Sequence, residues 1–212
     1  MKHLLIIGAR GYGREVYNVA TESIGFGVEF DVKGFLDDKT DALEGYNNYP
    51  PIISSVEVYE PKEDDVFICA LGEVSYKKKY AEIIEKKNGT FISLIHKTAH
   101  VSNNTAIGRG CIIGYYANVS CDIKIGDFVT IQPFVEIGHD AVIGNYSHLN
   151  TYSFVGGYAI IGDYATVHTG AIVLPKMEIG KGATIGAGSV IIRKIPNETT
   201  TFSQPANILK LK

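Results

Sequence analysis

The sequence places a histidine directly before an aspartate at His139-Asp140, and this pair is well suited to proton transfer. An imidazole changes its charge near neutral pH, and an adjacent carboxylate can hold the ring and raise its basicity. A second signal is the glycine-rich segment Gly8-Ala-Arg-Gly-Tyr-Gly13. Glycines let a backbone approach a phosphate, and the N-terminus of a following helix attracts an anion. The two segments predict a general base and a nucleotide site, respectively.

Two acidic residues, Asp37 and Asp38, end the apolar run Val32–Leu36. They follow the glycines by about 20 residues, where a carboxylate can accept hydrogen bonds from a ribose or sugar hydroxyl. A solvated strand end is an equally good interpretation of the same residues. The glycine spacing is GxxGxG and differs from the GxGxxG dinucleotide fingerprint, so a tight turn without a ligand also stays open.

Three histidines in the second half of the chain, His139, His148 and His168, raise the alternative of a zinc site. All three are expected to point outward from the repeat described below. Zinc needs three neutral imidazoles that converge on one ion. Because the spacing of these three differs from that of the β-helical carbonic anhydrases, we predict no metal.

A six-residue repeat from Val101 to Ile191 must position these side chains. Sixteen consecutive positions, six residues apart, hold Val, Ile or Leu: Val101, Ile107, Ile113, Val119, Ile125, Ile131, Ile137, Ile143, Leu149, Val155, Ile161, Val167, Val173, Ile179, Ile185 and Ile191. This period fits neither an α-helix nor a two-sided strand. It predicts a parallel β-helix of about five coils, with three hexads to a coil and the aliphatic residues inside. Glycine, which often follows the aliphatic residue, is expected to supply the backbone angles of the corners.

The first 95 residues predict a small α/β unit. Strands are expected over His3–Gly8, Val32–Leu36, Val66–Leu71 and Phe91–Ile95, with helices over Arg14–Ser23 and around Tyr76–Ile84. The three lysines from Lys77 to Lys79 are expected on a solvated helix face. Only about half of a doubly wound sheet is present, which suits one nucleotide better than a dinucleotide. Residues 1–95 are therefore predicted to bind a nucleotide sugar, and residues 96–212 to form the solenoid and a C-terminal tail.

Charge and cysteine content narrow the class of protein. The net charge of −3 and the lack of a basic block argue against nucleic acid as a partner. The apolar run Leu4–Ile7 is too short for a signal peptide or a membrane span. The three cysteines form no CxxC motif and are predicted to be reduced. We therefore expect a cytoplasmic protein without membrane insertion.

Several motifs together carry a family resemblance. They are Gly8-Ala-Arg-Gly-Tyr-Gly13, Gly34-Phe-Leu-Asp-Asp38, Leu94-Ile-His-Lys-Thr-Ala99, Ile137-Gly-His-Asp-Ala-Val-Ile-Gly144, Ile185-Gly-Ala-Gly-Ser189 and Pro205-Ala206. With these motifs the whole chain resembles the hexapeptide-repeat sugar acetyltransferases of the sialic acid O-acetyltransferase type. Within that family it is most similar to the bacterial UDP-amino-sugar N-acetyltransferases of surface-glycan pathways. The predicted fold is a half-Rossmann-like α/β domain followed by a left-handed parallel β-helix, which forms the acyltransferase domain.

The resemblance implies a homotrimer that binds acetyl-CoA in the groove between adjacent solenoids and the nucleotide sugar on the N-terminal domain. His139 matches the catalytic base, and Asp140 matches the acidic residue that tunes it. The residues matched to acetyl-CoA binding are His148, Gly157, Thr169 and Ala187. The residues matched to substrate binding are Arg10, Gly11, Tyr12, Asp37, Asp38 and Gln132.

The chain departs from the family pattern at four places, one of which is Ser203, where the closing Gly-x-Pro-Ala motif of the family has glycine. Tyr12 stands where the family usually has histidine, Arg10 where it often has serine or glycine, and Gln132 where it often has asparagine. These departures bear on the acceptor sugar more than on the reaction. O-acetylation of sialic acid or another sugar is therefore an alternative to N-acetylation of a UDP-linked amino sugar. A nucleotide-binding scaffold without turnover is an alternative of another class.

Overall fold

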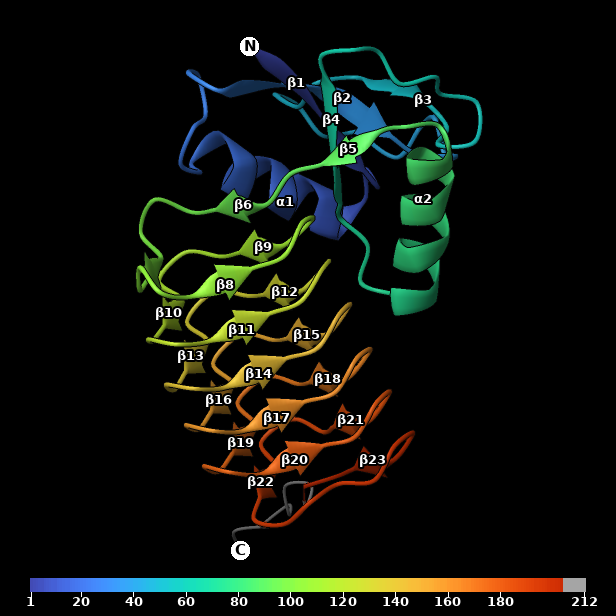
Figure 1. Ribbon diagram of the computed structural model, residues 1–212. Coiled ribbons are helices and arrows are strands. Elements are labelled where there is room, and N and C mark those ends of the chain that lie inside the picture. Colours follow the sequence, from blue (N-terminus) through green and yellow to red (C-terminus); the bar gives the residue numbers. More distant parts are fainter. Residues whose placement is uncertain (204–212) are drawn as a thin grey trace, which may run out of the picture.

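The computed structural model describes residues 1–203 of the 212-residue chain. An α/β domain lies at one end of a three-sided stack of coils, and the C-terminal coils form the other end (Figure 1). Helix α1 (Gly11–Thr21) lies between the sheet of this domain and the first coils, while α2 (Val74–Lys86) runs alongside the stack (Figure 1).

The N-terminal domain contains a five-stranded sheet in the order β3-β2-β1-β4-β5. Its strands are β1 (Lys2–Ile7), β2 (Phe30–Leu36), β3 (Ile52–Ser54), β4 (Asp65–Cys69) and β5 (Thr90–Phe91), all paired in parallel. Residues 4–7 of β1 are at most 1% exposed, as a parallel strand covered on both faces requires. Strand order reverses at β1, with β2 on one side and β4 on the other. Strand β3 was not predicted from the sequence, where no strand was expected between Leu36 and Val66.

The solenoid consists of two-residue strands in three parallel sheets. The seven-stranded sheet holds β6 (Leu94–Ile95), β9 (Ile112–Ile113), β12 (Thr130–Ile131), β15 (His148–Leu149), β18 (Thr166–Val167), β21 (Thr184–Ile185) and β23 (Thr200–Thr201). The six-stranded sheet holds β7 (His100–Val101), β10 (Asn118–Val119), β13 (Glu136–Ile137), β16 (Phe154–Val155), β19 (Ile172–Val173) and β22 (Val190–Ile191). The third sheet holds β8 (Ala106–Ile107), β11 (Lys124–Ile125), β14 (Val142–Ile143), β17 (Ile160–Ile161) and β20 (Glu178–Ile179).

The hexapeptide prediction is confirmed residue by residue. All sixteen aliphatic positions are the second residue of a strand, from Val101 in β7 to Ile191 in β22. Most of them form one continuous buried core inside the coils. Each strand pairs with the equivalent strand of the next coil, as when Val119 pairs with Ile137. The predicted fold class, an α/β domain followed by a parallel β-helix, is therefore correct.

The expected role of the repeat glycines is wrong. The left-handed backbone angles of the corners fall on the third residue after the aliphatic one, for example Phe128 (φ 57°) and Asp140 (φ 59°). Glycine directly after the aliphatic residue is needed because the next coil comes close. A Cβ on Gly138 would lie 2.6 Å from the backbone nitrogen of Gly157.

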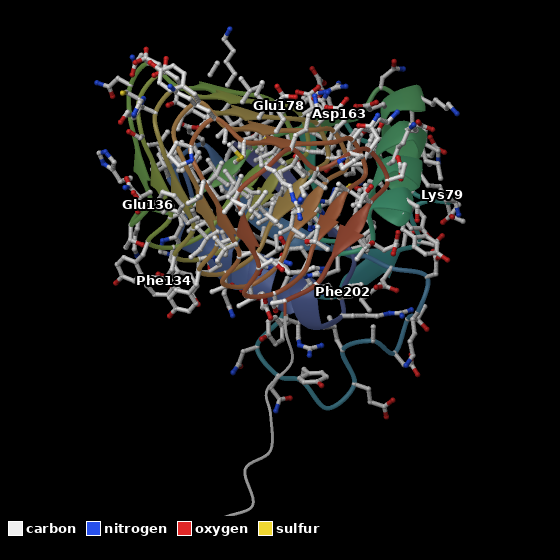
Figure 2. All side chains as sticks on the ribbon, turned by 90° about the horizontal axis from the view of Figure 1, so that it is seen from below. Lys79, Phe134, Glu136, Asp163, Glu178 and Phe202 are labelled. Atoms are coloured by element: carbon white, nitrogen blue, oxygen red, sulfur yellow. The ribbon has the colours of Figure 1, made fainter. Side chains whose placement is uncertain are left out.

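Aromatic residues at the left-handed positions stack from coil to coil. Phe128, Tyr146 and Tyr164 form one ladder along an edge of the solenoid. Tyr116, Phe134 and Tyr152 form a second ladder along another edge. Phe134 projects outward from its corner (Figure 2) and is 39% exposed, whereas Phe128 is 1% exposed. The first ladder is thus partly covered, and the second is open.

The strand expected over Phe91–Ile95 is divided between two sheets. Its first part, β5, pairs with β4 of the N-terminal domain, and its second part, β6, pairs with β9 of the solenoid. Ser93 lies between them, where its hydroxyl donates to the carbonyl of Gly108 (2.8 Å) and accepts from the amide of Cys111 (2.9 Å). The two parts of the molecule are therefore joined without a free linker.

The described part of the tail returns to the stack. Strand β23 (Thr200–Thr201) pairs with β21 and adds a seventh strand to its sheet. The Pro205-Ala206 motif lies outside the described residues.

Candidate active site

A cleft of about 480 Å³ lies where the strand order of the N-terminal sheet reverses. In parallel α/β sheets this is where ligands bind, beyond the carboxyl ends of the strands. The loops after β1, β2 and β4 line the cleft and bring together three of the predicted residues, Arg10, Asp37 and Asp38. Helix α1 begins at Gly11 beside them, and no side chain caps it. Its first amides therefore remain available to an anion such as a diphosphate.

The two acidic residues already have partners in the protein. Asp37 accepts hydrogen bonds from the amides of Ala9 (2.8 Å) and Lys39 (2.9 Å), so it braces the glycine-rich loop. Asp38 accepts from the Tyr80 hydroxyl (2.8 Å). Burial, together with this hydrogen bond, raises the pKa of Tyr80, which stays a neutral donor. Both carboxylates retain lone pairs for a sugar hydroxyl, but their placement is set by the fold.

A second cleft of about 410 Å³ separates α1 from the solenoid. Gln132 and Thr151 line its solenoid side, and the Gln132 side-chain oxygen accepts from the Thr151 hydroxyl (3.0 Å). Tyr12 lines both this cleft and the first one. The Tyr12 side chain therefore lies between the predicted nucleotide cleft and the cleft that holds the predicted acceptor residue Gln132.

The His139-Asp140 pair has the geometry expected of a base and its orienting group. Nδ1 of His139 lies 2.8 Å from the Asp140 carboxylate. A carboxylate accepts only, so Nδ1 carries a proton, and in the neutral form of the ring Nε2 has the free lone pair. The His139 side chain is 55% exposed. Tyr158 from the next coil packs its ring edge-to-face against the imidazole.

Gly157 lies directly beside the reactive nitrogen of this pair. A Cβ there would come within 2.9 Å of Nε2 of His139. Because residue 157 has no side chain, the His139 imidazole can occupy its observed position and Nε2 remains accessible.

Replacing Gly157 by alanine is expected to lower kcat for the acetyl transfer that the family resemblance implies by about tenfold to a hundredfold, because the added methyl displaces or blocks Nε2. Steady-state kinetics with thermal unfolding as the fold control measure this. A Gly157→Ala enzyme with unchanged kcat and unchanged melting temperature would contradict the assigned contact.

The remaining predicted residues lie at two different edges of the solenoid. The "His139 corner" comprises the turns that follow the strands of the six-stranded sheet, and it holds His139, Asp140 and Gly157. The "Gln132 corner" comprises the turns that follow the seven-stranded sheet, and it holds Gln132, Thr169 and Ala187. Neither cleft of this chain is lined by a residue of the His139 corner. One chain thus does not bring its predicted base to its own predicted acceptor site.

His148 points outward as predicted, but it is covered by another part of the chain. It is only 5% exposed. Helix α2 covers it, and Nζ of Lys77 lies 2.8 Å from its Nε2. Burial, reinforced by the Lys77 charge, lowers the pKa of His148 to about 3, so the ring is neutral at pH 7. Any ligand of His148 would meet Nδ1 only.

Lys77 is a residue that the sequence analysis placed wrongly. Instead of facing solvent it is 1% exposed, while Lys78 and Lys79 have side chains about half exposed. The buried residues of α2 are Lys77, Ala81 and Ile84, a spacing of four and three that marks one helix face. This spacing is the sequence signal that could have identified Lys77 as a buried residue. Tyr76, at the start of the helix expected around Tyr76–Ile84, lines the predicted nucleotide cleft.

Within residues 1–203, no group of three or more His, Cys, Asp or Glu side chains is placed to hold a metal ion. No helix in the same part of the chain is long and apolar enough to cross a membrane.

Family models match both parts of the chain. Residues 3–84 match the PglD N-terminal domain, and residues 122–157 and 158–193 match the bacterial transferase hexapeptide (six repeats). The chain thus combines a region that matches the PglD N-terminal domain with two regions that match bacterial hexapeptide transferases. A curated relative, UDP-N-acetylbacillosamine N-acetyltransferase of Bacillus subtilis (strain 168), is 33% identical over 117 residues, which cover 53% of this chain. The chain spans about half (51%) of the length of that relative.

Solved structures share the whole architecture. The acetyltransferase domain of PglB from Neisseria gonorrhoeae FA1090 is 28% identical, with a TM-score of 0.87 and coverage of 99% of this chain and 100% of that one. The same domain has been solved in complex with acetyl coenzyme A. WeeI from Acinetobacter baumannii AYE is 25% identical, with a TM-score of 0.83 and coverage of 99% and 100%. The arrangement of sheet and solenoid is thus that of known acetyltransferases.

Proposed function

We propose that this protein transfers the acetyl group of acetyl-CoA to the amine of a UDP-linked amino sugar in surface-glycan biosynthesis. The observation that carries the proposal is the exposed His139 whose Nδ1 is held by Asp140 and whose Nε2 is free beside Gly157. The relative named above acts, by its name, on a UDP-linked sugar. The cleft at the N-terminal domain supports a nucleotide as the handle of the acceptor.

The proposed reaction is a direct transfer. The amine nitrogen attacks the thioester carbonyl carbon of acetyl-CoA, and Nε2 of His139 takes up the proton that the nitrogen loses. The tetrahedral intermediate collapses, the carbon–sulfur bond breaks, and the CoA thiolate leaves and takes up a proton. Asp140 stabilises the imidazolium formed on the way. No covalent acyl-enzyme is needed, and no metal takes part in this scheme.

We further propose that the working unit is a homotrimer with each site built by two subunits. The His139 corner is flanked on both sides by exposed aliphatic side chains, among them Val142 and Ile160 on one sheet and Ile172 and Val190 on the other, each 37–55% exposed. Such a surface favours contact with another protein surface. Against a neighbouring subunit, the His139 corner of one chain would face the clefts of the next.

Mixing two inactive variants tests the shared site. His139→Ala removes the base, and Gly72→Phe fills the nucleotide cleft from a position where a Cβ meets nothing within 4 Å. In equimolar mixed trimers, about one quarter of the sites pair an intact His139 with an intact cleft. Co-expression or co-refolding is therefore expected to restore about that share of activity. Mixtures no more active than the separate variants would place the site within one chain.

A substrate panel tests the reaction itself. Release of free CoA is measured with several UDP-amino sugars, GDP- and dTDP-linked amino sugars, and free sialic acids. The proposal expects turnover with a UDP-linked amine and an N-acetylated product by mass spectrometry. An ester product would indicate O-acetylation. Absence of saturable acetyl-CoA binding in calorimetry would indicate a scaffold.

A further inference from the structure

A lysine of the N-terminal domain reaches across to the solenoid and ends beneath His148. Nζ of Lys77 lies 2.8 Å from Nε2 of His148, 2.8 Å from the hydroxyl oxygen of Thr130 and 3.3 Å from the carbonyl oxygen of Phe128. The lysine is 1% exposed, and Thr130 and His148 are 1% and 5% exposed. An ammonium has three hydrogens to donate, and here each has one acceptor.

The positive charge at Lys77 has no anionic partner among the described residues. The titratable groups that face it are the thiols of Cys69 and Cys111 and the imidazole of His148. Burial raises the pKa of Cys69 to about 12 and of Cys111 to about 11, so both thiols are neutral. Burial also lowers the pKa of Lys77, to about 8, which still leaves the ammonium predominant at pH 7. A buried lysine without a counter-ion is costly, and three good acceptors offset only part of that cost.

The contact decides which nitrogen of His148 carries the proton. An ammonium can only donate, so Nε2 must accept and the proton of the neutral ring must be on Nδ1. The opposite arrangement would require an uncharged amine that accepts from an Nε2–H. Nδ1 makes no hydrogen bond to any other residue in the described part of the chain, and it is the nitrogen left to meet a ligand.

We propose that Lys77 is a positioning residue for acetyl transfer, which fixes His148 as an Nδ1–H donor directed at the acetyl donor. The inference rests on the proposed function, in which His148 contacts acetyl-CoA. An N–H donor of fixed direction would stabilise the thioester carbonyl oxygen as negative charge develops on it. Lys77 itself is enclosed by protein and touches neither substrate.

The same contact links the donor side of the site to the acceptor side. Because the Thr130 oxygen accepts from Lys77, its hydroxyl hydrogen is free for another partner. Tyr12, the partition between the two clefts, turns its buried hydroxyl toward Thr130 without a hydrogen bond of normal geometry within residues 1–203. The hydrogen-bonded chain from His148 through Lys77 thus ends at Thr130, close to the Tyr12 hydroxyl.

The tautomer is measured directly on the folded, full-length protein. Nitrogen-15 NMR of ring-labelled histidine, with His148→Gln to assign the signal, separates a protonated from an unprotonated ring nitrogen. At pH 7 the proposal expects His148 with the proton on Nδ1 and none on Nε2. A proton on Nε2 would overturn the proposal whether or not the protein transfers acetyl groups.

The positioning role is measured with Lys77→Met and Lys77→Gln. Methionine keeps the apolar length but donates nothing, and we expect kcat to fall about tenfold to a hundredfold while KM for the nucleotide sugar changes little. Glutamine keeps an N–H donor for Nε2 and is expected to restore part of the loss. The matched control is Lys79→Met, since Lys79 lies on the outer side of α2 (Figure 2), where its ammonium pairs with exposed Glu57 and lies over the Tyr80 ring.

The outcomes separate the two proposals. A wild-type protein with no transferase activity would contradict the proposed function, but it would not affect the measured tautomer of His148. Wild-type kcat in folded Lys77→Met would overturn the role of Lys77 and leave the transferase intact. If Lys77→Met fails to fold, Lys77→Gln decides: kcat must stay within about tenfold of wild type if the Nδ1–H signal persists and must fall if that signal is lost, and either opposite combination would overturn the role of Lys77.

Discussion

Replacement of His139 by alanine is expected to lower kcat for acetyl transfer by about 10²–10⁴-fold, the usual contribution of a positioned general base. The side chain is half exposed and lies in a surface turn, so its loss leaves the solenoid core unchanged. Binding of acetyl-CoA and of the nucleotide sugar should persist, since neither cleft of the chain is lined by this residue. Steady-state kinetics and calorimetric titration of both substrates measure the two effects separately.

The matched control is His100→Ala, at an exposed histidine of the same sheet in β7, which is expected to keep full activity. His139→Asn adds a second arm, because it keeps a polar side chain of similar size but has no basic nitrogen. If His139→Ala retains near-wild-type kcat, the proton must be taken by another group and the proposed mechanism fails.

Replacement of Phe128 by alanine is expected to lower the free energy of unfolding by about 3–5 kcal/mol. The ring is 1% exposed, stacks on Tyr146 at a centroid distance of 4.8 Å and meets Phe91 of β5 edge-on at 4.9 Å. It therefore fills the space between the N-terminal sheet and the solenoid. The backbone carbonyl of Phe128 also accepts from Lys77. Urea unfolding monitored by circular dichroism measures the difference in free energy of unfolding between the wild-type protein and the variant.

Phe134→Ala is the control, and the two sites are closely matched. Both phenylalanines occupy the third position after an aliphatic residue, and both have left-handed backbone angles (φ 57° and 60°). Phe134 also stacks on a tyrosine, Tyr152, at 5.0 Å, but it is 39% exposed. Its loss is expected to cost about 1 kcal/mol. Equal losses at the two residues would mean that burial at the domain joint contributes nothing.

The solenoid was predictable because its information is local and repeated. Each hexad identifies its own inward-facing residue. The six-residue period from Val101 to Ile191 therefore predicts every strand from β7 to β22. The role of the glycines was not predictable from one hexad, because the constraint on Gly138 comes from Gly157 in the next coil. A single hexad carries no information about residues that are distant in the sequence but adjacent in the next coil.

The residue types of the site could be predicted from the sequence, but the contacts between residues distant in the sequence could not. His139 and Asp140 are adjacent in sequence, so their hydrogen bond could be foreseen. Lys77 and His148 are 71 residues apart, and their contact depends on how α2 packs against the seven-stranded sheet. A lysine within a run of three lysines also suggests a solvated surface, which held for its two neighbours and failed for Lys77.

The junction at Ser93 sets how the enzyme can select its acceptor. Two residues separate β5 from β6, and the Ser93 hydroxyl is bonded on both sides to the solenoid. Movement of the two halves about this junction would break the two Ser93 hydrogen bonds, so the structure disfavours domain closure on the substrate. In the proposed function, selection of the acceptor would then depend on clefts that are formed before the substrate binds.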